Sequence, residues 1–138
     1  MKTIATLITN VLLFLSLSLQ AQETYTVDAT VNGDGEHYIA ILIDNGDQFP
    51  GVTKTSIVQK GTKTKNGASF TFEGVTLGSY AILVFHDENN DGSLDMDGNM
   101  PSEAFGYSNY IMMGPPTWKN CSFEVNENVN LEVKLYQF

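Results

Sequence analysis

Arginine is absent from this 138-residue chain, and its seven basic residues are all lysines, set against sixteen aspartates and glutamates. The formal net charge of −9 makes nucleic acid a poor partner, because binding it requires clustered cationic side chains that replace counterions. An anionic membrane surface is disfavoured for the same reason. We expect the partner to be an unknown protein or a glycan.

Cysteine occurs once, at Cys121, so no disulfide can form within the chain. The chain is nevertheless long enough to bury a hydrophobic core without such a cross-link. Cys121, Phe123 and Val125 alternate with the polar residues Ser122 and Glu124, which directs the thiol toward the interior of a domain built from strands. We therefore predict a buried, unpaired thiol.

Long apolar runs are scarce, and the one that is present lies at the start of the chain. Lys2 precedes the apolar stretch Ile4–Leu19, and Ala21 places a small residue at a cleavage position. This pattern predicts a secretory signal peptide over residues 1–21, followed by a single domain over residues 22–138. The run is too short for a good membrane span, and no basic stop-transfer cluster follows it. We expect a secreted or periplasmic protein with no membrane insertion after cleavage.

Sustained helical periodicity is missing from residues 22–138, and alternation of apolar and polar residues dominates instead. The expected strands are Tyr25–Val31, Tyr38–Ile43, Lys54–Lys60, Ser69–Glu73, Tyr80–Phe85, Cys121–Val125 and Val129–Leu135. Tyr80–Phe85 is apolar throughout, as in a strand covered on both faces, and Lys54–Lys60 is the weakest and is expected at a sheet edge. About seven short strands separated by turn signals predict an all-β sandwich of immunoglobulin-like or transthyretin-like architecture.

An acidic segment follows the apolar strand and matches the pattern of a calcium-binding loop. Oxygen-bearing residues occupy positions 1, 3, 5, 7 and 9 of that pattern, in the order Asp87, Asn89, Asp91, Ser93 and Asp95. Gly92 stands at position 6, where the loop turns sharply, and Ser93 would contribute its backbone carbonyl. The spacing predicts Ca²⁺ in preference to Mg²⁺, which demands near-octahedral geometry and retains its waters.

The calcium pattern fails at position 12, where Gly98 replaces the bidentate glutamate. Asp97 and Glu103 are both candidates to fill this gap, so the predicted metal-binding loop has two possible closing ligands. The alternative is an acidic turn held by hydrogen bonds from aspartate side chains to the backbone. Against it, four carboxylates lie within residues 87–95, and no lysine or arginine occurs from 66 to 118 to offset their repulsion.

The sequence supports a catalytic role less well than a calcium-binding role. The two histidines, His37 and His86, are too few for a zinc site, and no serine stands in a nucleophile-elbow sequence. Paired carboxylates could serve a small hydrolase that uses the acidic loop. A deep pocket that combines His86, the carboxylates and Tyr107 would favour this enzyme. A metal ringed by Asp87, Asn89 and Asp91 would favour a binding or structural module without catalytic residues.

The segment from 86 to 119 is long, poor in strand signals and too apolar for disorder. Its large aromatic residues Tyr107, Tyr110 and Trp118 could stack on a glycan or a protein partner. We favour a second role for them, in which the rings pin the segment onto the sandwich.

The segment Leu77–Asp95, together with Pro101, Glu103, Phe105–Asn109 and Met113–Pro116, resembles a group of bacterial secreted proteins catalogued as domain of unknown function 2141. The resemblance covers most of the expected mature chain. It implies an exported one-domain protein with a transthyretin-like or immunoglobulin-like sandwich. It implies no assigned activity and no catalytic residue.

Overall fold

A computed structural model describes residues 21–138, so the predicted signal peptide lies outside the described residues, apart from Ala21. Within this range the chain forms eleven strands and one short helix. The elements are β1 (Thr24–Asn32), β2 (Tyr38–Ile43), β3 (Ile57–Lys60), β4 (Thr62–Lys63), β5 (Gly67–Thr76), β6 (Gly78–His86), β7 (Met96–Asp97), β8 (Met100–Pro101), β9 (Phe105–Tyr107), α1 (Trp118–Cys121), β10 (Phe123–Val125) and β11 (Val129–Val133). No helix in this part of the chain has the length and apolar character needed to cross a membrane.

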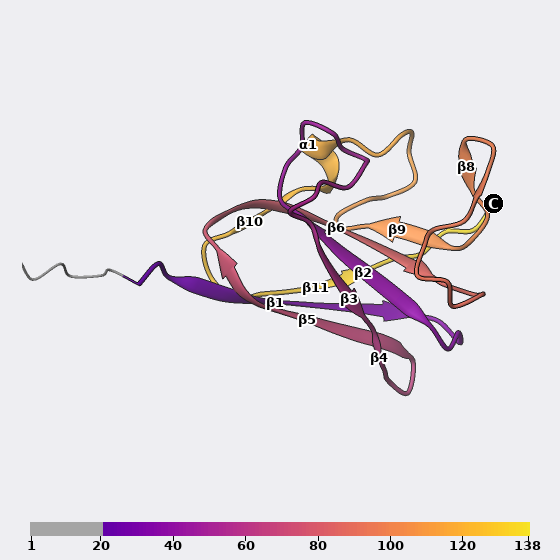
Figure 1. Ribbon diagram of the computed structural model, residues 1–138, viewed down its shortest axis with the longest axis horizontal. Coiled ribbons are helices and arrows are strands. Elements are labelled where there is room, and N and C mark those ends of the chain that lie inside the picture. Colours follow the sequence, from indigo (N-terminus) through magenta and orange to yellow (C-terminus); the bar gives the residue numbers. More distant parts are fainter. Residues whose placement is uncertain (1–20) are drawn as a thin grey trace, which may run out of the picture.

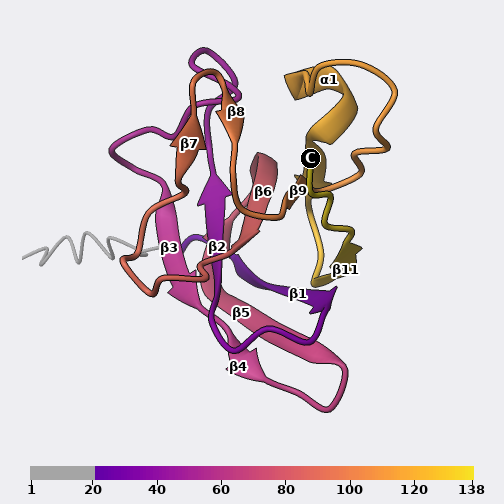
Figure 2. The ribbon, with the colours of Figure 1, turned by 90° about the vertical axis from the view of Figure 1, so that its right-hand side faces the viewer.

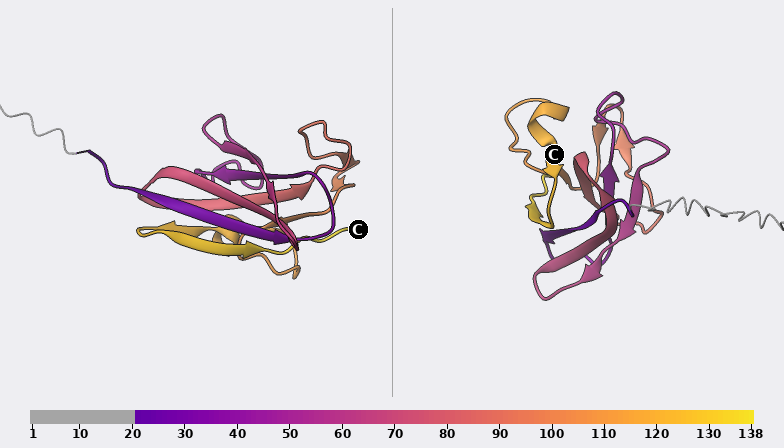
Figure 3. Two further views of the ribbon diagram at one scale, coloured as in Figure 1. Left: turned by 90° about the horizontal axis from the view of Figure 1, so that it is seen from below. Right: turned by 90° about the vertical axis from the view of Figure 1, so that its left-hand side faces the viewer.

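The strands form two main sheets and one small hairpin (Figure 1). The first sheet has the order β11-β1-β5-β4, and its β1–β11 pair is parallel, with Val27 opposite Val129 and Val31 opposite Val133. The second sheet has the order β10-β6-β2-β3, and β9 also pairs with β6. Figure 3 shows the two sheets as stacked layers, while β7 and β8 form the separate hairpin.

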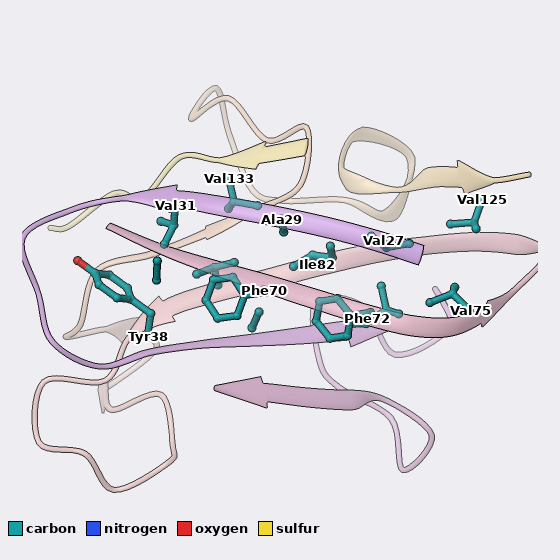
Figure 4. Packing of buried hydrophobic residues seen from close by; sticks show 14 residues of the cluster. Val27, Ala29, Val31, Tyr38, Phe70, Phe72, Val75, Ile82, Val125 and Val133 are labelled. Atoms are coloured by element: carbon teal, nitrogen blue, oxygen red, sulfur yellow. The ribbon is translucent and has the colours of Figure 1, made fainter. Parts of the chain in front are cut away.

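The inner faces of the two sheets enclose the main hydrophobic core (Figure 4). Alternate residues of β1 and β5, such as Val27 and Phe72, meet alternate residues of β2 and β6, such as Leu42 and Ile82. Because strand side chains alternate between faces, the period-two pattern of the sequence produces this arrangement directly. The prediction of an all-β protein is confirmed.

The second sheet is apolar on its outer face as well, where Ile39 and Ile43 of β2 lie beside Leu83 and Phe85 of β6. The prediction that Tyr80–Phe85 is covered on both faces is therefore confirmed. Irregular segments provide this outer cover. Figure 2 shows the loop after β2, the β7–β8 hairpin and α1 projecting on the side of this sheet that faces away from β1 and β5.

All seven expected strands are present, as β1, β2, β3, β5, β6, β10 and β11, and β3 lies at the edge of its sheet. The remaining strands, β4, β7, β8 and β9, have two or three residues each and lie where the sequence predicts turns or loop. The expectation that residues 86–119 carry little strand is thus wrong for Phe105–Tyr107. These three residues add to β6 by backbone pairing.

Cys121 is fully buried and unpaired, as predicted, but the reason inferred from the sequence is wrong. The residue ends α1 instead of sharing a strand face with Phe123 and Val125. It packs in the outer cluster with Leu83, whereas Val125 belongs to the core between the sheets. The thiol therefore packs against the outer face of the second sheet at the end of α1. It thereby helps to hold the covering segment, residues 86–121, against that face.

Burial raises the pKa of the Cys121 thiol, so its reactive thiolate is suppressed as well as shielded. We expect an aromatic disulfide reagent to leave the native protein unlabelled and to label it fully after denaturation. Absorbance at neutral pH measures both states. Rapid native labelling, or a disulfide-linked dimer on a non-reducing gel, would contradict this assignment.

Candidate functional site

The acidic loop begins at Asp87, directly after β6, and this residue is only 1% exposed. Its backbone N–H donates to the carbonyl of His37 at 2.9 Å, which ties the start of the loop to the chain entering β2. Its carboxylate accepts hydrogen bonds from the backbone N–H groups of Asp91, at 3.2 Å, and Gly92, at 2.9 Å. Gly92 has φ +81°, a left-handed conformation that suits glycine and lets the chain fold back over this carboxylate.

Three polar side chains meet inside the turn that follows. The terminal amide of Asn89 lies between two carboxylates and donates to Asp91 Oδ2 at 3.2 Å and to Asp95 Oδ2 at 2.6 Å. Asp91 also accepts from the backbone N–H of Ser93 at 2.9 Å. The predicted residues at positions 3, 5 and 9 of the pattern thus converge on one point.

The pKa values of the two exposed carboxylates of this turn, Asp91 and Asp95, shift in opposite directions. The hydrogen bond from Ser93 N–H lowers the pKa of Asp91, because it stabilises the ionised form. Partial desolvation, and then the negative charge of Asp91, raise the pKa of Asp95. The turn therefore concentrates negative charge that its own hydrogen bonds offset only in part.

Glu103 closes the loop, although it lies outside the calcium pattern. Its carboxyl is buried, at 4% exposure, and its two oxygens accept from the backbone N–H groups of Glu88 and Asp95, both at 3.1 Å. Burial, followed by repulsion from Asp95, raises the pKa of this carboxyl. Asp97, the other candidate, is exposed on β7 and pairs through its backbone with Met100. The fold thus brings Glu103 to the loop and leaves Asp97 on the hairpin.

Within residues 21–138, no three His, Cys, Asp or Glu side chains stand close enough together to hold a metal ion as they are placed. The oxygens that converge are carboxylate oxygens of Asp91 and Asp95, joined by the amide N–H groups of Asn89, and carboxylate is a hard ligand type that suits calcium better than zinc. The ligand types of the acidic loop therefore suit a hard cation such as calcium.

His86 lies apart from these carboxylates. Its ring stacks on Tyr38, with the centroids 4.9 Å apart, and its Nδ1 is 3.8 Å from a carboxylate oxygen of Glu88. Packing with Tyr38 therefore fixes the imidazole beside Gly35, where β6 ends next to the start of β2.

The three aromatic residues singled out in the sequence belong to one network on the outer face of the second sheet. Tyr107 contacts Tyr110 and Phe49 edge to face, and Phe49 contacts Trp118 in the same manner. Burial raises the pKa of Tyr107 to about 12, and its hydroxyl donates to the carbonyl of Pro50. Tyr110 and Trp118 are half-buried. The network joins segments from three parts of the chain.

A cavity of about 920 Å³ lies beside the loop, and the sequence analysis does not anticipate it. Its wall consists of Ile41, Pro50, Gly51, Val52, Leu83, Phe85, Gly92, Ser93, Leu94, Met96, Asn99, Met100, Pro101, Phe105, Tyr107, Tyr110, Met112, Gly114, Pro115, Pro116 and Phe138. These residues come from distant parts of the chain, and most of them are apolar, with Ser93, Asn99 and two tyrosines as the polar side chains. The grouping of methionines and prolines between 96 and 116 is the one sequence signal that could have indicated such a wall.

The fold and the loop define a class of protein: an all-β domain with an acidic loop after a central strand and an apolar cavity beside it. The family described as "uncharacterized protein conserved in bacteria", domain of unknown function 2141, matches residues 26–133, and the chain belongs to this family. The family resemblance noted from the sequence is thereby confirmed. Neither a curated protein nor a solved structure matches the chain.

The different placement of the two acidic candidates predicts different effects on stability. Replacing Glu103 with alanine removes the acceptor for two backbone N–H groups, and we expect a loss of about 2–3 kcal/mol in the free energy of unfolding. Asp97→Ala removes an exposed carboxylate and should change it by less than about 0.5 kcal/mol. Urea unfolding in the presence of a chelator measures both values. Equal losses would contradict the placement of Glu103.

Proposed function

We propose that this protein is an exported module, with a binding or structural role, that holds one calcium ion in the loop from Asp87 to Asp95. The convergence of Asn89, Asp91 and Asp95 on one point carries the proposal. The left-handed turn at Gly92, position 6 of the pattern, supports it further. The proposal also includes an immunoglobulin-like or transthyretin-like form of the two-sheet architecture.

The side chains of Asp87, Asn89, Asp91 and Asp95 would hold the ion, together with the carbonyl of Ser93. Glu103 would complete the set, because each of its oxygens retains a lone pair beyond the backbone N–H group that it accepts. Bound calcium supplies positive charge to a stretch, residues 66–118, that contains no lysine or arginine. In this role the ion stabilises the covering segment and takes part in no reaction.

The acidic turn without metal remains the competing explanation for the loop. Hydrogen bonds from the backbone to Asp87 and Asp91 are expected of such a turn and also of a calcium loop. The two explanations differ in the repulsion between Asp91 and Asp95, because a bound cation would relieve it and a bare turn would not.

The hydrolase reading lacks the arrangement that would favour it. Tyr107 lies in the wall of the large cavity, but neither His86 nor any carboxylate of the acidic loop does. His86 instead stacks on Tyr38. The geometry thus favours the module over the enzyme.

Calcium should raise the stability of the protein. Extracellular calcium modules bind with dissociation constants of about 10⁻⁴ to 10⁻³ M. At about twentyfold excess over that constant, binding adds RT ln 21, or about 1.8 kcal/mol, to the free energy of unfolding. For a domain of this size the melting temperature should rise by roughly 5–10 °C. Scanning calorimetry with chelator and with millimolar calcium measures the shift.

Two variants show whether the shift arises in the loop. Asp91→Ala lacks a central ligand and should lose most of the calcium response. Glu127→Ala removes one negative charge from the exposed turn between β10 and β11 and should keep that response. Identical wild-type melting curves in chelator and calcium, with no heat in titration calorimetry, would reject the calcium proposal.

Export makes a separate prediction for the start of the chain. The pattern from Lys2 to Ala21 directs cleavage after Ala21, so intact-mass analysis of protein recovered outside the cytoplasm should give a chain that begins near Gln22. Mature protein that still carries Met1 would refute the signal peptide.

A further inference from the structure

The large cavity is formed by one face of the second sheet and by three segments that rise beside it. Its floor is the outer face of the second sheet, formed by Ile41 of β2, Leu83 and Phe85 of β6, and Phe105 and Tyr107 of β9. Its sides come from irregular segments near 50–52 and 110–116 and from residues 92–101, which include the β7–β8 hairpin. In Figure 2 the β7–β8 hairpin and the loop after β2 rise on one side of this face, and the segment leading to α1 rises on the other.

The sides of the cavity are stiffened by proline. The chain has four prolines, Pro50, Pro101, Pro115 and Pro116, and all four lie in the cavity wall. Proline restricts the backbone and so reduces the freedom that ligand binding would otherwise remove. A wall that concentrates every proline of the chain is therefore suited to keeping a ligand cavity formed.

Methionine provides the adaptable part of the same wall, through Met96, Met100 and Met112. Unbranched thioether side chains adjust to irregular apolar shapes and make favourable contacts with aromatic rings. Met96 and Met100 belong to the β7–β8 hairpin and are about half exposed, which places them at the mouth of the cavity. The wall thus combines a rigid frame with adjustable apolar contacts.

Charge is missing from this wall. None of its side chains is Asp, Glu, Lys, Arg or His. Its polar side chains are those of Ser93, Asn99 and two tyrosines. The tyrosine hydroxyls are already engaged, since Tyr107 donates to the Pro50 carbonyl at 3.3 Å and Tyr110 donates to the Gly114 carbonyl at 2.6 Å. Because burying a charge without a partner is costly, an ionised group on a ligand would find no compensation there.

We propose that this cavity binds one neutral, apolar small molecule that contains an aromatic or alicyclic ring system. The volume lies within the range of about 300–1,000 Å³ typical of small-molecule pockets. Tyrosine and phenylalanine rings on the floor offer faces and edges for contact with a ring. The inference gives a ligand class to the binding role proposed above, and it rests on the cavity wall, which shares only Gly92, Ser93 and Leu94 with the acidic loop.

A matched pair of fluorescent probes tests the required neutrality. N-phenyl-1-naphthylamine is neutral, and 1-anilinonaphthalene-8-sulfonate has the same ring system with one added sulfonate. The neutral probe should show saturable binding to a single site, at least about tenfold tighter than the sulfonate, because the wall offers no cation to the anionic group. Equal or tighter binding of the sulfonate, or binding that does not saturate, would overturn the proposal.

Two substitutions test the location. Met100→Glu places a carboxylate at the mouth of the cavity, on a residue that is 47% exposed, and should weaken the neutral probe by about tenfold. Leu77→Glu makes a similar change at a residue that is 65% exposed, in the turn before β6 and outside the cavity wall, and should leave binding unchanged. Equal effects of the two variants would refute the assignment.

Two further measurements separate this inference from other occupants and from the calcium proposal. Sedimentation should show a monomer, whereas a dimer that Met100→Glu dissociates would show that a second copy of the chain covers the cavity and would reject the small-molecule proposal. The neutral probe should bind in chelator as well as in calcium. Binding in chelator supports the cavity even where calcium fails to stabilise the protein, and its loss in chelator contradicts a cavity that forms without calcium.

Discussion

Strand β6 must be shielded from water on both faces, and the rest of the structure follows from this requirement. Ile82 and Val84 face the core between the sheets, while Leu83 and Phe85 face outward. The first sheet covers only the inner face. On the outer face, irregular segments perform the same task, and β9 widens the sheet by pairing with β6. The long segment after β6 is thus a structural cover, and its apolar composition is required.

Covering a sheet with irregular chain buries backbone groups that no regular ladder satisfies. Three buried polar side chains provide the missing partners: Asp87, Glu103 and Ser108. Ser108 accepts from the N–H of Ile82 at 2.9 Å and donates to the carbonyl of Cys121 at 2.6 Å, which joins β6 to the end of α1. In the described part of the chain, no buried side-chain nitrogen or oxygen lacks a hydrogen-bond partner. The acidic loop belongs to this set, since Asp87 and Glu103 hold its backbone irrespective of any ion.

The sequence predicts most of the sheet structure, because alternation along one strand is a local property. It predicts β1, β2 and β5 well, and it identifies β6 as buried on both faces. It misses β9, since Phe105–Tyr107 is too short to show a period and acquires its strand geometry from β6. It places Cys121 in the wrong cluster, because α1 ends just before the alternation starts. The sequence does not decide whether Asp97 or Glu103 reaches the acidic loop. The β7–β8 hairpin decides it, because pairing of Met96 with Pro101 leaves Asp97 on the hairpin, and this pairing forms only in the folded protein. The cavity is beyond sequence reasoning because its wall joins segments that meet only in space.

The parallel pair of β1 and β11 has a mechanical consequence. The two strands lie side by side and run in the same direction, so the start of β1 and the end of β11 lie at opposite ends of the pair. A force that pulls these two ends apart acts along the strands and across the hydrogen bonds between them. The ladder from Val27–Val129 to Val31–Val133 would be loaded in shear, with its pairs sharing the tension instead of opening one after another. Because β1 is also held by β5 on its other side, this geometry suits a domain that must stay folded while its two ends are under tension.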